Sequence, residues 1–338
     1  MQEKILVIQT AFLGDAVLTL PMIQKLKEKF PTSEIEILCL PQSKELFKYS
    51  KSVSKVIPYD KRGTQKSFLY FLKLASLIRR KKYLYIYSPH RSFRSSLIVY
   101  LSGVKNTTGF DIASISFVYS TRIKYIKDKH EVARNLDLIG FDTNYDNWKV
   151  LPMIDIDSDV ESNTEYIVKN LTNKMIAAVA PGSVWKTKIY PRESYIEIIK
   201  FLIKKDYFVV LLGGRDDELL CNGIEKEFTE SVKSFAGKMN IIESISLLKK
   251  CSVLISNDSA PTHLGMIANI PTLTIYCSTV PAFGFSPYNA KSNYVSFDDL
   301  SCKPCGIHGR DQCPIQTFDC GYKLLPQTIF STLDKMNL

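Results

Sequence analysis

Short apolar runs alternate with amphipathic stretches along the first part of the chain. Residues 4–8 (KILVI) and 34–38 (EIEIL) are compact and rich in β-branched side chains, which is typical of buried strands. Similar runs at 53–57 and 84–87 flank a helical pattern at 67–80. Strand–helix–strand order of this kind predicts a parallel sheet with helices on both faces.

The same alternation restarts after a polar interval at 141–172, where the apolar pattern fades. The strands and the helix predicted beyond it lie at 175–180, 192–204 (the helix), 208–212, 253–256 and 272–276. We therefore predict an α/β protein of two doubly wound, Rossmann-like domains, 1–155 and 156–338, which face a central cleft where such proteins usually bind ligands.

Composition and charge narrow the class of protein. The chain has 338 residues, 45% of them hydrophobic and 23% charged, which are values of a globular protein of two domains. No apolar run reaches the roughly 18 residues of a spanning helix. Gly14 and Asp15 interrupt the apolar N-terminal stretch, so we expect no signal peptide and a cytoplasmic protein.

A formal net charge of +10 predicts attraction to anions such as a membrane surface, a phosphorylated substrate or nucleic acid. The basic run at 79–82 is typical of a solvated helix face. The sequence contains no recognised nucleic-acid-binding module, so we do not expect nucleic acid as a partner.

The turn after the first strand, 9–15 (QTAFLGD), carries the first candidate chemistry. It lacks the G-x-G-x-x-G pattern, which disfavours a nicotinamide or flavin dehydrogenase. Asp15 is either an ordinary residue of a helix N-terminus or a general base for an attacking hydroxyl. We expect Pro21, further along, to kink this helix or to start a new one.

The loop after the strand at 175–180 has the features of a phosphate site. Gly182 permits close approach of the backbone, Ser183 offers a hydroxyl, and Lys186 and Lys188 bring positive charge. These residues predict a cradle for a diphosphate. The Walker A pattern does not occur in the sequence, so we do not expect P-loop hydrolysis.

Two further strand ends carry polar groups. Residues 256–263 (SNDSAPTH) predict a helix start that offers N–H groups and a positive dipole end to a phosphate, or else an ordinary loop capped by Asp258 or Ser259. After Gly213-Gly214, an acid of the stretch 215–218 could bind ribose hydroxyls or merely begin a helix.

These motifs occur in order along nearly the whole chain. They are Leu13-Gly14-Asp15, Pro181-Gly182-Ser183, Lys188 before Tyr190-Pro191, Gly213-Gly214, Ser256-Asn257-Asp258-Ser259 with His263, Ser278-Thr279-x-Pro281 with Ser286-Pro287, and Cys302-Lys-Pro-Cys305 with Cys313-Pro314 and Cys320. Together they resemble glycosyltransferase family nine, the heptosyltransferases that extend the inner core of lipopolysaccharide from ADP-heptose. The tail resembles the branch that adds the second heptose.

The resemblance implies a GT-B fold and an inverting, metal-independent transfer that requires no cofactor and uses ADP-L-glycero-D-manno-heptose as the donor. Asp15 matches the catalytic base, and Ser183 and Lys188 match positions that hold the ADP phosphates. Either Asp216 or Asp217 corresponds loosely to the ribose-binding acid. The candidate donor residues are Ser183, Lys186, Lys188, Gly213, Gly214, Asp216, Asp217, Asp258, Ser259, Ala260 and His263.

The acceptor implied by the resemblance is an anionic lipid A–core molecule, bound mainly by the N-terminal half. A basic chain without a spanning segment fits peripheral contact with the cytoplasmic face of the inner membrane. We also expect the C-terminal helix to pack back on the N-terminal domain. The candidate acceptor residues, whose alternative is simple solvated loops, are Gly14, Lys61, Arg62, His90, Arg91 and Arg94.

Two patterns could suggest a metal. The acids of 155–159 (DIDSD) lie in the polar interval, so we interpret them as solvated. The tail C-x2-C-x7-C-x6-C gives weak zinc candidates, Cys302, Cys305, Cys313 and Cys320, but its later spacings are irregular and the other cysteines suit small buried residues. We therefore expect no metal.

Two departures from the family pattern leave the donor sugar open. Cys277 stands where a Gly is common, and Val184-Trp185 replaces more polar residues. The alternatives are a transferase that uses another nucleotide sugar, a nucleotide-sugar epimerase of the same fold, and a non-catalytic anion-binding protein.

Overall fold

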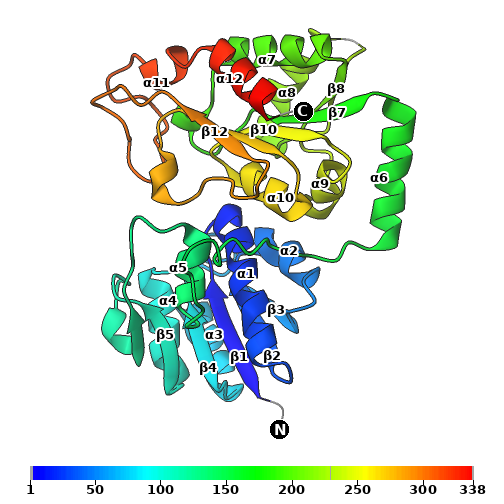
Figure 1. Ribbon diagram of the computed structural model, residues 1–338. Coiled ribbons are helices and arrows are strands. Elements are labelled where there is room, and N and C mark those ends of the chain that lie inside the picture. Colours follow the sequence, from blue (N-terminus) through cyan, green and yellow to red (C-terminus); the bar gives the residue numbers. More distant parts are fainter. Residues whose placement is uncertain (1–2, 229, 337–338) are drawn as a thin grey trace. The chain divides into compact units, whose positions relative to one another are not determined.

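The computed structural model describes residues 3–228 and 230–336. Contacts within the chain divide it into two compact units, Met1–Asp155 and Ile156–Leu338. We call them the first and the second unit and describe each by itself (Figure 1).

The first unit is built on a six-stranded parallel sheet with the order β3-β2-β1-β4-β5-β6. Its strands are β1 (Lys4–Gln9), β2 (Glu34–Cys39), β3 (Lys55–Pro58), β4 (Tyr85–Ser88), β5 (Asn106–Phe110) and β6 (Thr121–Ile123). Its helices are α1 (Leu13–Lys29), α2 (Lys44–Lys48), α3 (Phe68–Arg80), α4 (Phe93–Ser102) and α5 (Glu131–Asp137). Strand order reverses between β1 and β4, which makes this point the expected ligand site of the sheet.

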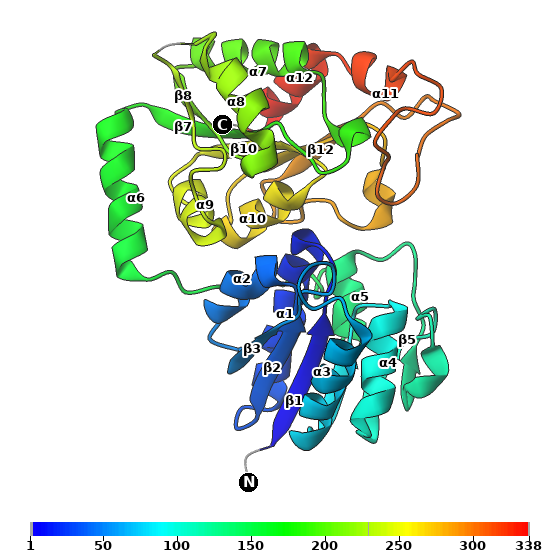
Figure 2. The same cartoon turned by 180° about the vertical axis from the view of Figure 1, so that it is seen from behind.

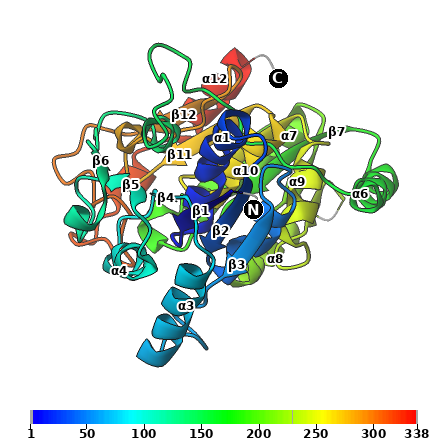
Figure 3. The same ribbon diagram turned by 90° about the horizontal axis from the view of Figure 1, so that it is seen from below.

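Helices cover both faces of this sheet. In the view of Figure 3, α3 and α4 lie on one side of the strands and α1 on the other. Phe71, Leu74 and Ile78 of α3 repeat at helical spacing and are buried in the core with Leu6 and Ile86 of the strands.

Pro21 neither ends α1 nor starts a new helix, because α1 runs unbroken from Leu13 to Lys29. The expectation of a new start there is wrong. Val17, Leu18 and Leu20 are fully buried, as are several neighbours on the same helix. Burial of such a set stabilises the helix by more than the roughly 3 kcal/mol that an interior proline costs.

The second unit repeats the same topology, with the order β12-β11-β10-β7-β8-β9 and all pairs parallel. Its strands are β7 (Met175–Ala180), β8 (Tyr207–Leu211), β9 (Val232–Ser234), β10 (Val253–Asn257), β11 (Thr272–Tyr276) and β12 (Asn293–Ser296). Its helices are α6 (Ser158–Leu171), α7 (Arg192–Lys204), α8 (Glu218–Glu225), α9 (Ile241–Leu248), α10 (Ala260–Ala268), α11 (Asp319–Tyr322) and α12 (Pro326–Lys335). Here strand order reverses between β7 and β10.

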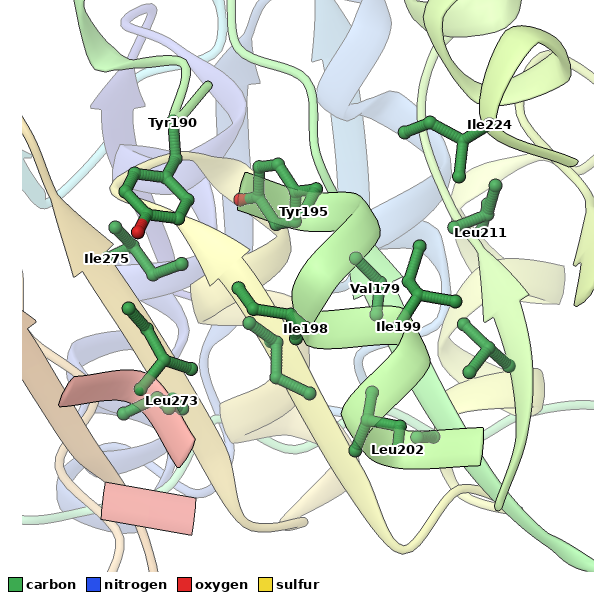
Figure 4. Packing of buried hydrophobic residues seen from close by; sticks show 14 of the residues in the cluster. Val179, Tyr190, Tyr195, Ile198, Ile199, Leu202, Leu211, Ile224, Leu273 and Ile275 are labelled. Carbon is green, nitrogen blue, oxygen red and sulfur yellow. The ribbon is translucent and has the colours of Figure 1, made fainter. Parts of the chain in front are cut away.

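The core of the second unit lies between its sheet and α7 (Figure 4). Ile198 and Leu202 of α7 pack with Ile275 of β11 and its neighbours. The C-terminal helix α12 joins this core, since Phe330 stacks on Phe201 of α7 with ring centroids 4.5 Å apart. The apolar side of α12 therefore packs in the core of its own unit, and its packing on the first domain stays a prediction.

The polar interval at 141–172 contains α6, which the sequence analysis did not predict. Thr164 is its only described residue that is fully buried, so the periodic apolar signal was weak. The acids before it are placed as solvated groups: Asp155 pairs with Lys51 at 2.7 Å and Asp159 lies in the first turn of α6. Within the part of the chain that the structure describes, no helix is both long and apolar enough to span a bilayer.

Candidate functional site

Asp15 lies in the first turn of α1, directly after the central strand of the first sheet, and is partly buried. Burial and, to a smaller extent, the nearby Glu131 raise the pKa of its carboxyl to about 7, against a lowering by Arg91. Backbone N–H groups of Asp15 and Phe12 also interact with the carboxylate, as is common for a first-turn acid, and they lower the pKa less than burial raises it. A carboxyl that titrates near neutral pH has the acidity of a general base.

Lys61 and His90 meet at Thr10, where β1 ends. The Lys61 ammonium donates to the Thr10 carbonyl oxygen at 2.6 Å, and His90 Nδ1 pairs with Thr10 Oγ1 at 2.9 Å and with Ser95 Oγ at 2.8 Å. Burial lowers the pKa of Lys61 to about 8 and that of His90 to about 3, and neighbouring cations act in the same direction on both. His90 is therefore neutral and held by hydroxyls, whereas Lys61 carries charge at neutral pH.

Three arginines complete a basic rim around this strand end. Arg94 donates to the Lys61 carbonyl oxygen at 3.2 Å and to the Lys66 carbonyl oxygen at 3.3 Å, so it shapes the loop before α3. The Arg91 guanidinium lies 4.2 Å from the centroid of the Tyr125 ring, and that of Arg62 lies 5.3 Å from the Phe12 ring. Among the predicted acceptor residues, Gly14 directly precedes Asp15 in α1.

A buried ion pair on α5 was missed by the sequence analysis. Glu131 and Arg134 pair at 3.2 Å with side chains that are only 5% and 2% exposed. Arg134 also donates to the Tyr125 hydroxyl, and its guanidinium lies 4.7 Å from that ring. The E-x-x-R spacing on a helix could have indicated the pair, although not its closeness to Asp15.

In the second unit, the loop after β7 is held by Asn257, at the end of β10. The Asn257 side-chain amide donates to the Pro181 carbonyl oxygen at 2.7 Å and accepts from Tyr190 N at 3.0 Å and from the Tyr195 hydroxyl at 2.8 Å. This fully buried residue lies within the predicted SNDS motif but was not predicted as a site residue. It fixes the loop that carries Ser183 against the neighbouring strand.

Lys188 and Asp258 form the charged centre of this site. Lys188 Nζ lies 2.7 Å from Asp258 Oδ2 and donates to the Asp258 carbonyl oxygen at 2.9 Å, with the two side chains 12% and 10% exposed. Thr279 donates to the same carboxylate oxygen at 2.7 Å. Asp258 therefore orients Lys188, and an ammonium has a third donor left for an anion.

The start of α10 lies beside this pair. Ser259 is the N-cap residue but makes no side-chain cap hydrogen bond, and Ala260 is the first helical residue. Burial lowers the pKa of His263 to about 4, and its Nδ1 has no hydrogen-bond partner among the described residues. The arrangement offers a helix N-terminus, an oriented lysine and a neutral imidazole, which together suit a phosphate.

The other predicted phosphate-loop residues are less fixed. Ser183 is partly buried and its hydroxyl accepts from Trp185 N at 3.4 Å. Lys186 is exposed on the 3-10 turn Lys186–Lys188.

Asp217 shapes the double-glycine turn after β8. Its carboxylate accepts from Gly214 N at 2.9 Å, and a Cβ at Gly182 would lie only 1.9 Å from its Oδ1. A Cβ at Gly213 would lie 2.7 Å from the Asp217 Cβ, so glycine is required at both positions. Asp216 beside it is exposed.

The cysteine tail braces the phosphate loop. Thr187 N donates to the Arg310 carbonyl oxygen at 3.0 Å, and Arg310 N donates back to Thr187 Oγ1 at 2.8 Å. The four predicted zinc candidates line a cavity of about 160 Å³, but the described residues contain no group of three or more His, Cys, Asp or Glu placed to hold a metal ion. The four other cysteines, Cys39, Cys221, Cys251 and Cys277, are buried as predicted.

Comparison with solved structures identifies the fold. The structure entitled "Structure of E. coli ADP-heptose lps heptosyltransferase II" superimposes with a TM-score of 0.78, at 21% identity and with 98% of each chain covered. The doubly wound, two-domain α/β fold is thus the predicted GT-B fold.

Sequence comparison gives the same result. Lipooligosaccharide heptosyltransferase 2 of Haemophilus influenzae is 23% identical over 83% of this chain and 85% of its own length. The protein of the same name from Campylobacter jejuni serotype O:6 is 24% identical over 99% of both chains. The model of glycosyltransferase family 9 (heptosyltransferase) matches residues 71–314, more than half of the chain, so the chain belongs to this family of glycosyltransferases. The resemblance stated from the motifs is confirmed.

Proposed function

We propose that the chain transfers heptose from ADP-L-glycero-D-manno-heptose to the inner core of lipopolysaccharide, by an inverting displacement that needs no metal. The observation that carries the proposal is Asp15, a carboxyl titrating near pH 7 within a basic rim at the end of a central strand. The names of the relatives and of the similar structure support the sugar and the acceptor. Membership in a transferase family favours this function over the epimerase and over a non-catalytic protein.

Asp15 is the general base of the proposed reaction. The acceptor hydroxyl oxygen forms a bond to the anomeric carbon while the bond from that carbon to the ADP oxygen breaks. The hydroxyl proton goes to Asp15, and ADP leaves with the electron pair. A single displacement inverts the configuration at the anomeric carbon.

The second unit supplies the donor site in this proposal. The α10 N-terminus, with Ser259 and Ala260, and the Lys188 ammonium offset the charge that grows on the departing diphosphate. These groups can replace the metal that other glycosyltransferases use for the same purpose. Asp216 is our choice for the ribose contact, since Asp217 is engaged by Gly214.

The first unit supplies the acceptor site in this proposal. Lys61, Arg62 and Arg91 surround the strand end near Asp15 and fit the phosphates and sugar carboxylates of a lipid A–core molecule. His90 and Arg94 hold the surrounding loops in place. An acceptor embedded in the bilayer places the enzyme at the cytoplasmic face of the inner membrane.

The test is the release of ADP from ADP-heptose, with and without a heptose-deficient core acceptor, by the wild type and by Asp15→Asn. We expect acceptor-dependent release that falls by about a hundredfold or more in the variant, as for loss of a general base. Chelation with EDTA should leave the rate unchanged. Release by the wild type from another nucleotide sugar alone would contradict the donor, and full activity of Asp15→Asn would contradict the base.

A further inference from the structure

A long segment of the first unit has charge of only one sign. Between Asp60 and Asp111 the chain contains no Asp or Glu, yet it holds eleven basic residues: Lys61, Arg62, Lys66, Lys73, Arg79, Arg80, Lys81, Lys82, Arg91, Arg94 and Lys105. Lys81 is paired with Glu36 of β2. The segment includes all of α3 and α4, so the surface that these two helices contribute is cationic.

The outer side of α3 is apolar as well as basic. Its inner side is buried in the core, as described above, but Phe68, Leu69 and Leu72 point outward with 67%, 72% and 39% of their surface exposed. Lys73 is exposed on the same outer side. A water-facing helix side would ordinarily carry polar groups, so these side chains have an energetic reason to leave water.

The first turn of α4 extends this surface. Phe93 is 58% exposed, and α3 and α4 pack side by side (Figure 2). Arg94 joins the beginnings of the two helices, since it lies in the first turn of α4 and donates to the carbonyl oxygen of Lys66 just before α3. We call Lys66, Phe68, Leu69, Leu72, Lys73 and Phe93 the α3 face.

The α3 face continues directly into the proposed acceptor site. Arg94, which holds Lys66, also donates to the carbonyl oxygen of Lys61, whose ammonium bonds to Thr10. The short loop 61–66 thus connects the apolar side chains of the α3 face, which suit a lipid environment, to the cations of the proposed acceptor site, which suit anionic groups on a sugar.

We propose that the α3 face docks on a bilayer that contains anionic lipid, with Phe68, Leu69, Leu72 and Phe93 entering the headgroup region. Charge complementarity supports this partner. Asp60, whose carboxylate accepts from Gly63 N and Thr64 N, is the acid that borders the loop 61–66. An apolar patch on a segment that otherwise carries only basic charge matches a negatively charged membrane surface, where basic residues strengthen the binding of inserted apolar groups. The inference rests on the proposed function, because a membrane-embedded acceptor gives the docking its purpose.

The first experiment measures binding of the full chain to vesicles by co-sedimentation, with no substrate present. We expect binding to vesicles of phosphatidylcholine with phosphatidylglycerol, and much weaker binding to phosphatidylcholine alone. The double variant Phe68→Ser/Leu69→Ser should bind about tenfold or more weakly, since two exposed apolar groups lose their insertion. Lys73→Glu should weaken binding by about tenfold at low salt and less at high salt.

Matched controls lie in the second unit. Leu219 is 90% exposed and Lys226 is exposed, so Leu219→Ser and Lys226→Glu change the same chemistry elsewhere. All five altered side chains are exposed, and equal melting temperatures would show that the variants fold. The proposal is overturned if the wild type does not bind anionic vesicles or if Phe68→Ser/Leu69→Ser binds them as the wild type does. It is also overturned if Leu219→Ser loses as much vesicle binding as Phe68→Ser/Leu69→Ser.

A second experiment separates this inference from the proposed function. On a deacylated, water-soluble acceptor, Phe68→Ser/Leu69→Ser should transfer heptose at the wild-type rate, whereas on acceptor embedded in anionic vesicles its rate should fall about tenfold with its binding. Failure of the wild type on the soluble acceptor would contradict the proposed function and leave the vesicle-binding result standing. Equal rates of the wild type and Phe68→Ser/Leu69→Ser on embedded acceptor would contradict the proposed docking but not the proposed function.

Discussion

Both units carry their candidate site residues at the point where strand order reverses. The central ionisable group is a carboxyl in the first unit and a lysine ammonium in the second. In the first unit, at β1 and β4, a carboxyl whose charged neighbours are Glu131 and Arg91 titrates near pH 7, chiefly because of burial. In the second, at β7 and β10, a lysine is held by a carboxylate beside a helix N-terminus. Strand order determines where a ligand can bind, and a few residues after each strand determine which ionisable groups lie there.

The largest effect that would sharpen this comparison comes from Lys188. We expect Lys188→Met to lower kcat by about a hundredfold to a thousandfold, because the departing diphosphate loses a positioned cation. Removal of the lysine also leaves the buried Asp258 carboxylate without its cation, so the melting temperature should fall.

Lys188→Met/Asp258→Asn provides the control. The double variant should regain much of the lost thermal stability and none of the lost activity. If the melting temperature and kcat recovered together, Lys188 would be a structural residue and the contrast between the units would be wrong.

A smaller effect is expected at Gly182, where the loop after β7 lies against the Asp217 side chain. Gly182→Ala places a methyl group on Asp217 and should destabilise the second unit by about 2 kcal/mol or more, as measured by denaturant unfolding. Gly182→Ala/Asp217→Ala removes the collision and should recover part of that loss. Gly223→Ala, in α8 where the nearest atom is 3.9 Å away, is the matched control and should be neutral or stabilising.

The smallest effect concerns the acidity of Asp15. Since its pKa is raised to about 7, kcat/KM should rise with pH up to about 7 and level off above it, as the base form accumulates. Glu131→Gln removes a negative neighbour, so the pKa of Asp15 falls and the rising limb moves to lower pH. Glu28→Gln, an exposed carboxylate on the same helix, should leave the profile in place.

The raised pKa of Asp15 also makes the stability of the folded protein depend on pH. The native state holds the Asp15 proton more tightly than the unfolded chain, whose pKa is 3.8. The resulting destabilisation is absent below about pH 4, grows as pH rises, and is complete above about pH 7. Asp15→Asn should therefore melt higher than the wild type at pH 8 and close to it at pH 4, and the reverse order would show that the carboxyl is not desolvated.

Much of the fold was predictable because it rests on local patterns. Apolar runs marked the central strands, and α3 begins and ends within one residue of its prediction. Helix α6 was missed because it buries little. A new helix start at Pro21 was wrong, since the burial of a whole helix outweighs one lost hydrogen bond.

The candidate site was predictable only in part. Strand ends and motifs indicated Asp15, Lys188 and Asp258, but nothing local indicates that Asn257 bonds to a loop 76 residues away. The pairing of Glu131 with Arg134 was visible in the spacing, whereas its effect on Asp15 depends on how α5 packs. Contacts between distant segments leave no periodic signal in the sequence.

The hydrogen bonds between Thr187 and Arg310 join residues that are 123 positions apart in the sequence. During synthesis, the phosphate loop therefore leaves the ribosome long before the segment that braces it. A nascent chain can complete the first unit and most of the second sheet while this loop still lacks its partner. The order of translation thus makes the braced form of this loop one of the last structures that the growing polypeptide acquires.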